Sequence, residues 1–104
     1  MKNVSLVLRY TKTVKLDVTL SENCEIRDIV ISGDFFAYPE DSVEKLENRI
    51  KGCASRECIE EAFSELASVV ILGVNVEDLK NKIISVYDKC RENLSSKGYF
   101  SGDP

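Results

Sequence analysis

The spacing of apolar residues changes once along this chain, and that change is the strongest constraint on its fold. In residues 14–20 apolar and polar side chains alternate, as in a strand with one buried face. From residue 43 onward apolar side chains recur every three or four positions, which is the period of a helix. Strands followed by helices predict the α+β class.

Two more strands are expected around this one, at Val4–Tyr10 and Glu25–Ser32. The third strand can keep both Ile26 and Ile29 on its buried face only if a bulge or twist lies near Arg27, because their spacing is odd. The first half of the chain is therefore predicted to form a three-stranded antiparallel meander.

About three helices are expected to follow and to pack on one face of the sheet. Asp41 and Glu44 have the spacing of a capping box, and Ser55 and Asn75 are expected to cap the second and third helices. Gly98 is expected to end the last helix. We expect a single domain spanning residues 1–104, and the chain has no internal repeat or linker.

The meander ends at an aromatic corner formed by Gly33, Asp34, Phe35, Phe36 and Tyr38. Gly33 permits backbone angles that other residues resist, and Asp34 can accept a hydrogen bond from a backbone N–H in the turn. Two interpretations are open for the aromatic residues. They either fill the core at a strand-to-helix turn, which residue chemistry favours, or they are presented to a partner or ligand.

The apolar run at residues 69–74 is equally ambiguous, because it fits a buried helix end and a short strand.

Charge and composition exclude several classes of function. The net charge is −4 with no clustered Lys and Arg, so nucleic acid is not an expected partner. No apolar run is long enough to span a membrane, and the N-terminus lacks a signal-peptide pattern, so we expect a cytoplasmic protein. The chain has no histidine, which excludes Ser–His and Cys–His nucleophilic catalysis and mixed Cys/His zinc sites.

The four cysteines, Cys24, Cys53, Cys58 and Cys90, are expected to be free thiols. This follows from the absence of an export signal and from a core that needs no cross-links. Short C-x-x-C pairs of the kind that four-cysteine metal sites use are absent, so no metal site is expected. Acidic residues on the helices are scattered over solvated faces, and no catalytic residue or cofactor-binding residue is expected on this chain.

Two stretches of the sequence are distinctive, the strand Lys15-Leu-Asp-Val-Thr-Leu20 and the run Ile26-Arg-Asp-Ile-Val-Ile-Ser-Gly-Asp-Phe-Phe36, which is similar to an "I-x-G-D-F-F" corner. On these stretches the chain resembles the C-terminal accessory domain of lipoate–protein ligases. The segments 43–53, 56–66 and 76–87 resemble the helices of that domain. One departure is Thr11-Lys-Thr-Val14, where the family often carries glycines.

The resemblance implies a free-standing, non-catalytic subunit that forms a heterodimer with a catalytic large subunit. That subunit would bind ATP, Mg and lipoate and form lipoyl-adenylate, and lipoyl-carrier domains (the 2-oxoacid dehydrogenase E2 and the glycine cleavage H protein) would accept the lipoyl group. The aromatic corner, residues Gly33, Asp34, Phe35, Phe36 and Tyr38, is then expected at the subunit interface.

Two alternatives stay open. A three-stranded sheet followed by helices also resembles iron–sulfur assembly scaffolds and sulfur-acceptor proteins, which would use the cysteines. An enzyme acting through its own carboxylates is the other, and the missing histidine counts against it.

Overall fold

Three antiparallel strands form the main sheet in the order β1-β2-β3, and they are β1 (Lys2–Arg9), β2 (Thr13–Leu20) and β3 (Ile26–Gly33). This computed structural model describes the backbone of residues 1–66 and 69–101 and the side chains of residues 1–66 and 69–93. The α+β class and the meander predicted from the apolar spacing are confirmed.

The expected irregularity in β3 is present as a β-bulge. Ile29 lies opposite Val18 and Ile26 lies opposite Leu20, so β3 has one more residue than β2 between these two pairs, at Arg27. The extra residue returns Ile26 to the face that carries Ile29, and both side chains are buried.

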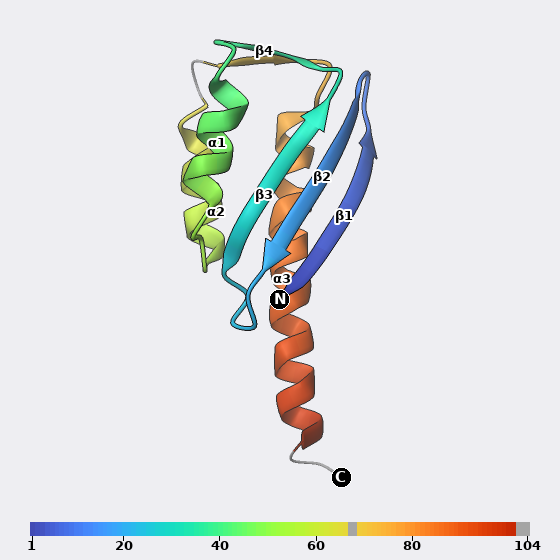
Figure 1. Ribbon diagram of the computed structural model, residues 1–104, viewed down its shortest axis with the longest axis vertical. Helices are drawn as coiled ribbons and strands as arrows, with labels where there is room; N and C mark the ends of the chain where they lie inside the picture. The colour runs from blue at the N-terminus through green and yellow to red at the C-terminus, as the bar shows by residue number, and fades with distance from the viewer. Residues whose placement is uncertain (67–68, 102–104) are drawn as a thin grey trace.

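Three helices follow: α1 (Ser42–Ile50), α2 (Arg56–Ser64) and α3 (Val76–Ser101). Figure 1 shows α3 running behind the sheet and continuing past the turn between β2 and β3, with α1 and α2 beside β3. The helix end expected at Gly98 is wrong, because α3 continues to Ser101. An internal glycine costs a helix only about 1 kcal/mol relative to alanine, which neighbouring residues can offset.

Of the three predicted helix caps, two are observed and one is not. Ser55 and Asn75 each accept a hydrogen bond from the backbone N–H three residues on, at 3.2 and 2.9 Å, so both caps are confirmed. The capping box at Asp41 is wrong, because its side chain makes no capping hydrogen bond. Its carboxylate instead lies 3.4 Å from the Lys45 ammonium, one turn along the helix.

All three helices and one face of the sheet share a single hydrophobic core. The central strand supplies a fully buried row: Val14, Leu16, Val18 and Leu20. The edge of β3 is covered by α1, where the Glu47 carboxylate accepts a hydrogen bond from the Ile31 N–H at 2.7 Å. The opposite face of the sheet is open, and it exposes Val7 and Val30.

A second sheet of two short strands closes one end of the molecule. β4 (Phe36–Tyr38) pairs antiparallel with β5 (Val70–Leu72), and we call this pair the ribbon. Figure 1 shows the ribbon beyond the end of β3 and above the start of α1. Of the two interpretations of residues 69–74, the short strand is therefore the observed one.

The expectation of free thiols is wrong. Cys24 is bonded to Cys90 and Cys53 to Cys58, with Cα–Cα distances of 5.9 and 5.5 Å, and no cysteine among the described residues is free. The fold makes the first pair by laying the turn between β2 and β3 against α3, which brings together residues 66 positions apart. Such a pairing depends on tertiary structure, so sequence spacing does not reveal it.

Candidate functional site

The aromatic corner begins where β3 meets the end of the first hairpin. Gly33 has φ +155°, and a Cβ at this position would collide with the Thr13 carbonyl oxygen. The Asp34 carboxylate accepts a hydrogen bond from the Thr13 N–H at 3.3 Å. The expected role of Gly33 is confirmed. Asp34 does accept a backbone hydrogen bond, but the expected donor in the turn is wrong, because the donor lies on the neighbouring strand β2. Together they fix the direction in which the chain leaves the sheet.

The three aromatic residues of the corner divide between the two interpretations. Phe35 is half-buried and packs against the core. Phe36 and Tyr38 belong to β4 and point the other way, with 56 % and 64 % of their surface exposed. The core interpretation therefore holds for Phe35 and is wrong for Phe36 and Tyr38. The alternation of side chains along a strand explains the split.

The second strand of the ribbon, β5, adds two more exposed apolar side chains beside Phe36 and Tyr38. Leu72 lies opposite Phe36 and Val70 lies opposite Tyr38, and these two β5 side chains are 58 % and 49 % exposed. Ala37 occupies the other face and is half-buried. We call the four exposed residues the ribbon face. Sequence reasoning missed its β5 half, for which the only signal was the apolar run at residues 69–74.

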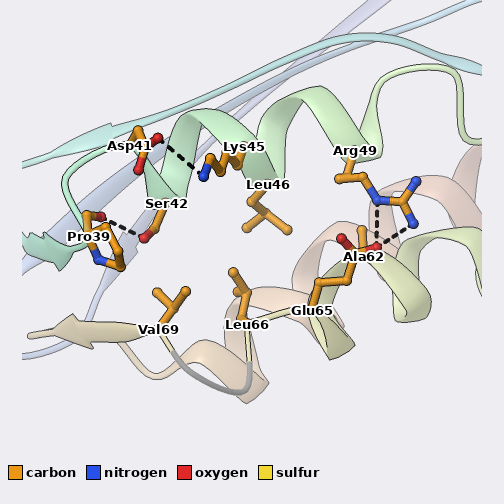
Figure 2. A pocket seen from close by; sticks show the side chains of 10 residues that line it. All are labelled: Pro39, Asp41, Ser42, Lys45, Leu46, Arg49, Ala62, Glu65, Leu66 and Val69. Atoms are coloured by element: carbon orange, nitrogen blue, oxygen red, sulfur yellow. Dashed lines mark hydrogen bonds and ion pairs between the residues drawn. The ribbon is translucent and has the colours of Figure 1, made fainter.

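A groove of about 250 Å³ starts where the ribbon ends. It is lined by Pro39, Asp41, Ser42, Lys45, Leu46, Arg49, Ala62, Glu65, Leu66 and Val69. Figure 2 shows Leu46, Leu66 and Val69 pointing into the groove from different segments of the chain. The charged side chains on its walls are paired with each other: Lys45 with Asp41, and Arg49 with Glu65, whose Nε–Oε2 distance is 2.6 Å.

Among the residues whose side chains the structure describes, one titratable group, the phenol of Tyr10, has a clearly shifted pKa. Burial of Tyr10 raises the pKa of its phenol well above the usual value, and the hydrogen bond to Asp78 and the negative charge of that carboxylate raise it further. The hydroxyl donates to Asp78 Oδ2 at 2.7 Å. Because the phenol stays protonated, its hydrogen bond to Asp78 links the end of β1 to the first turn of α3.

Comparison with known proteins places the chain in a family. No family model matches it. It is 37 % identical over 84 residues to lipoate–protein ligase A subunit 2 of Thermoplasma acidophilum, a match that covers 73 % of this chain and 88 % of the relative. The chain belongs to the lipoate–protein ligase subunit 2 family. The resemblance drawn from its strands and aromatic corner is thereby confirmed.

A solved structure agrees with this assignment. It shows an archaeal lipoylation system from Thermoplasma acidophilum, a bipartite lipoate protein ligase and its E2 lipoyl domain. One of its chains superposes on this subunit 2 family member with a TM-score of 0.62 and 30 % identity. The match covers 75 % of this chain and 90 % of the other. Sequence and structure comparisons thus point to the same kind of ligase subunit.

The part of this subunit 2 chain that the structure describes holds no cluster of three metal-ligating side chains. No helix within it combines the length and apolarity needed to cross a membrane. The iron–sulfur alternative loses its support, because the cysteines it would use are joined in disulfides and offer no thiolate. The ribbon face and the groove beside it are the candidate functional surface of the described residues.

Proposed function

We propose that this chain is the non-catalytic accessory subunit of a bipartite lipoate–protein ligase, and that it forms a heterodimer with the catalytic chain. The observation that carries the proposal is the match to the Thermoplasma subunit 2, which extends over 88 % of that relative. The exposed apolar ribbon face supports a role in binding, because large apolar patches on a protein surface mark sites of interaction.

The catalytic chain is the place where ATP, Mg and lipoate are expected to bind. The accessory subunit then acts through that chain's conformation: it binds the state competent to form lipoyl-adenylate better than the other states and so raises its population. The lipoyl group passes to a lysine of a carrier domain, for which the 2-oxoacid dehydrogenase E2 and the glycine cleavage H protein are the candidates. The complex is expected to work in the cytoplasm.

Within the complex, the aromatic corner is proposed to lie at the subunit interface. Gly33 and Asp34 set the direction of the chain, and Phe35 anchors the corner in the core. This arrangement leaves Phe36 and Tyr38 free to contact the partner. Because Gly33 and Asp34 set where the chain leaves the sheet, both rings project from the same face of the ribbon.

The test is pyrophosphate release from ATP and lipoate by the catalytic chain, measured with and without this protein. We expect release that depends on the added chain. A folded catalytic chain whose release is the same in its presence and absence would contradict the accessory role. Heat-denatured accessory chain at equal concentration is the control for nonspecific protein effects.

A further inference from the structure

We propose that the ribbon face and the groove form one continuous docking surface, and that the catalytic chain of the ligase inserts an apolar side chain into the groove. This inference rests on the proposed function and adds to it the surface and the chemistry of the contact. It extends the expected interface from the aromatic corner to β5, α1 and α2.

The first support is the composition of the ribbon face. Phe36, Tyr38, Val70 and Leu72 stand opposite one another in two pairs on one face, and each is about half exposed or more. Scattered exposed apolar residues are ordinary, whereas four adjacent ones on a short ribbon form a patch typical of interaction sites. Aromatic residues in such a patch are the ones that most often dominate binding energy.

The second support is that the groove adjoins one end of the ribbon. Pro39 follows the last residue of β4, Val69 precedes the first residue of β5, and both line the groove. A partner that covers the ribbon face and extends past this end of the ribbon can therefore reach the groove. Leu66 and Val69 are half-buried and offer it apolar contacts there, and the buried Leu46 lies behind them (Figure 2).

The charges on the groove walls indicate what kind of group it accepts. Lys45 and Arg49 pair with Asp41 and Glu65 on the groove walls, so the positive and negative charges there balance and give a phosphate or carboxylate little net attraction. An apolar side chain gains burial against the leucines and leaves both pairs intact. The groove is therefore suited to a protein side chain and not to the nucleotide or the lipoate carboxylate.

The apolar character of the ribbon face favours the catalytic chain over the lipoyl domain as the occupant. A carrier domain must leave after each transfer, and short-lived encounters use small contacts. Permanent subunit contacts are the more hydrophobic class. The surface described here belongs to that class.

The test compares two matched substitutions in titrations against the purified catalytic chain. Leu72→Asp places a charge on the ribbon face, and Val7→Asp places one on the open face of the main sheet at the same starting exposure, 58 % in both cases. We expect Leu72→Asp to weaken binding about tenfold or more, and Val7→Asp to leave it within about twofold. Circular dichroism and a melting curve show that each variant is folded.

A second variant addresses the groove separately. Val69→Trp fills the groove from a wall position that is only half-buried, so the core need not shift to accept it. We expect weaker binding by the folded variant. Binding should also change little between about 0.1 and about 1 M salt, because apolar contacts are not screened by ions.

The outcomes separate this inference from the proposed function. Equal binding by wild type and Leu72→Asp, with pyrophosphate release still dependent on the chain, would overturn the docking surface alone. Unchanged binding by Val69→Trp would overturn the groove insertion. Loss of lipoyl-domain binding in Leu72→Asp, with catalytic-chain binding intact, would show that the occupant is the carrier. A wild-type chain that does not bind the catalytic chain would overturn both proposals.

Discussion

At the scale of single residues, the hydrogen bond between Tyr10 and Asp78 makes the free energy of unfolding depend on pH. The folded-state pKa of Tyr10 lies above its usual value near 10, so the folded chain holds the phenol proton more tightly than the unfolded chain does. This contribution to stability is complete below pH 10 and is lost as the pH rises through the folded-state pKa.

We therefore predict that the wild type loses stability above pH 10 more steeply than Tyr10→Phe. The variant lacks the titrating phenol, and at neutral pH it should be less stable by about 1–2 kcal/mol through the lost hydrogen bond to a carboxylate. Urea unfolding at several pH values between about 8 and about 11 measures both effects. Parallel pH profiles for the two proteins would contradict this account of Tyr10.

Two glycines with positive φ allow a matched comparison. Gly52 has φ +89° and open space where a side chain would begin, so Gly52→Ala should cost about 1 kcal/mol of backbone strain. At Gly33 an added Cβ also meets the Thr13 carbonyl oxygen, which belongs to the sheet and cannot move freely. Gly33→Ala should therefore be the more destabilising substitution in denaturant unfolding. The reverse order would show that the corner is less fixed than described.

Local signals in the sequence predict single residues well where the competing interactions are also local. Ser55 and Asn75 cap their helices because the N–H groups they satisfy lie three residues away. Asp41 does not, because its backbone (φ −88°, ψ 8°) lacks the extended conformation that lets an N-cap side chain reach the free N–H groups. The Cys24–Cys90 pairing escaped prediction because it depends on how the turn between β2 and β3 packs against α3. The local Cys53–Cys58 pairing escaped it because all four cysteines were expected to be free thiols.

At the scale of elements, the ribbon likewise shows that sequence patterns do not predict features that depend on contacts between distant parts of the chain. Long alternating or helical patterns in β1–β3 and α1–α3 predicted their elements, because many residues repeat the signal. The two ribbon strands have three residues each, which is too short for an alternating pattern of apolar residues to be recognised. They also lie far apart along the chain, so the sequence does not show that they pair. The proposed docking surface could thus be predicted only in part, from the aromatic residues of β4.

The exposure of Phe36 leads to a prediction for the ribbon. Phe36→Ala should change the free energy of unfolding by less than about 1 kcal/mol, because the ring is more than half exposed. It should weaken binding of the catalytic chain about tenfold or more, since aromatic residues anchor interfaces. Chemical denaturation and calorimetric titration give the two values. A folding defect of about 3–5 kcal/mol without a binding defect would restore the core interpretation.

The two disulfides should contribute unequally to stability. Closing a loop across 66 positions restricts the unfolded chain more than closing one across five, by chain-entropy estimates about 4 against about 2 kcal/mol. Replacing Cys24 and Cys90 by alanine should therefore lower the unfolding free energy more than replacing Cys53 and Cys58.

Thiol titration of the denatured wild type without reductant should find no free thiol, and four free thiols would contradict both bonds.

At the scale of the whole molecule, the helices cover one face of the main sheet and the ribbon closes one end. The open face carries mainly polar residues with Val7 and Val30 among them, whereas the ribbon face is apolar throughout. The ribbon end is therefore the surface that we propose for contact with the catalytic chain of the ligase.

Amide hydrogen exchange of this chain, with and without the catalytic chain, tests that claim most directly. A two-stranded ribbon is marginally stable alone, so its amides should exchange quickly in the free protein. We predict that the catalytic chain slows exchange at residues 36–38 and 70–72 and leaves β1 unchanged. Slowed exchange confined to β1 and the open face of the sheet, with the ribbon unchanged, would contradict the account.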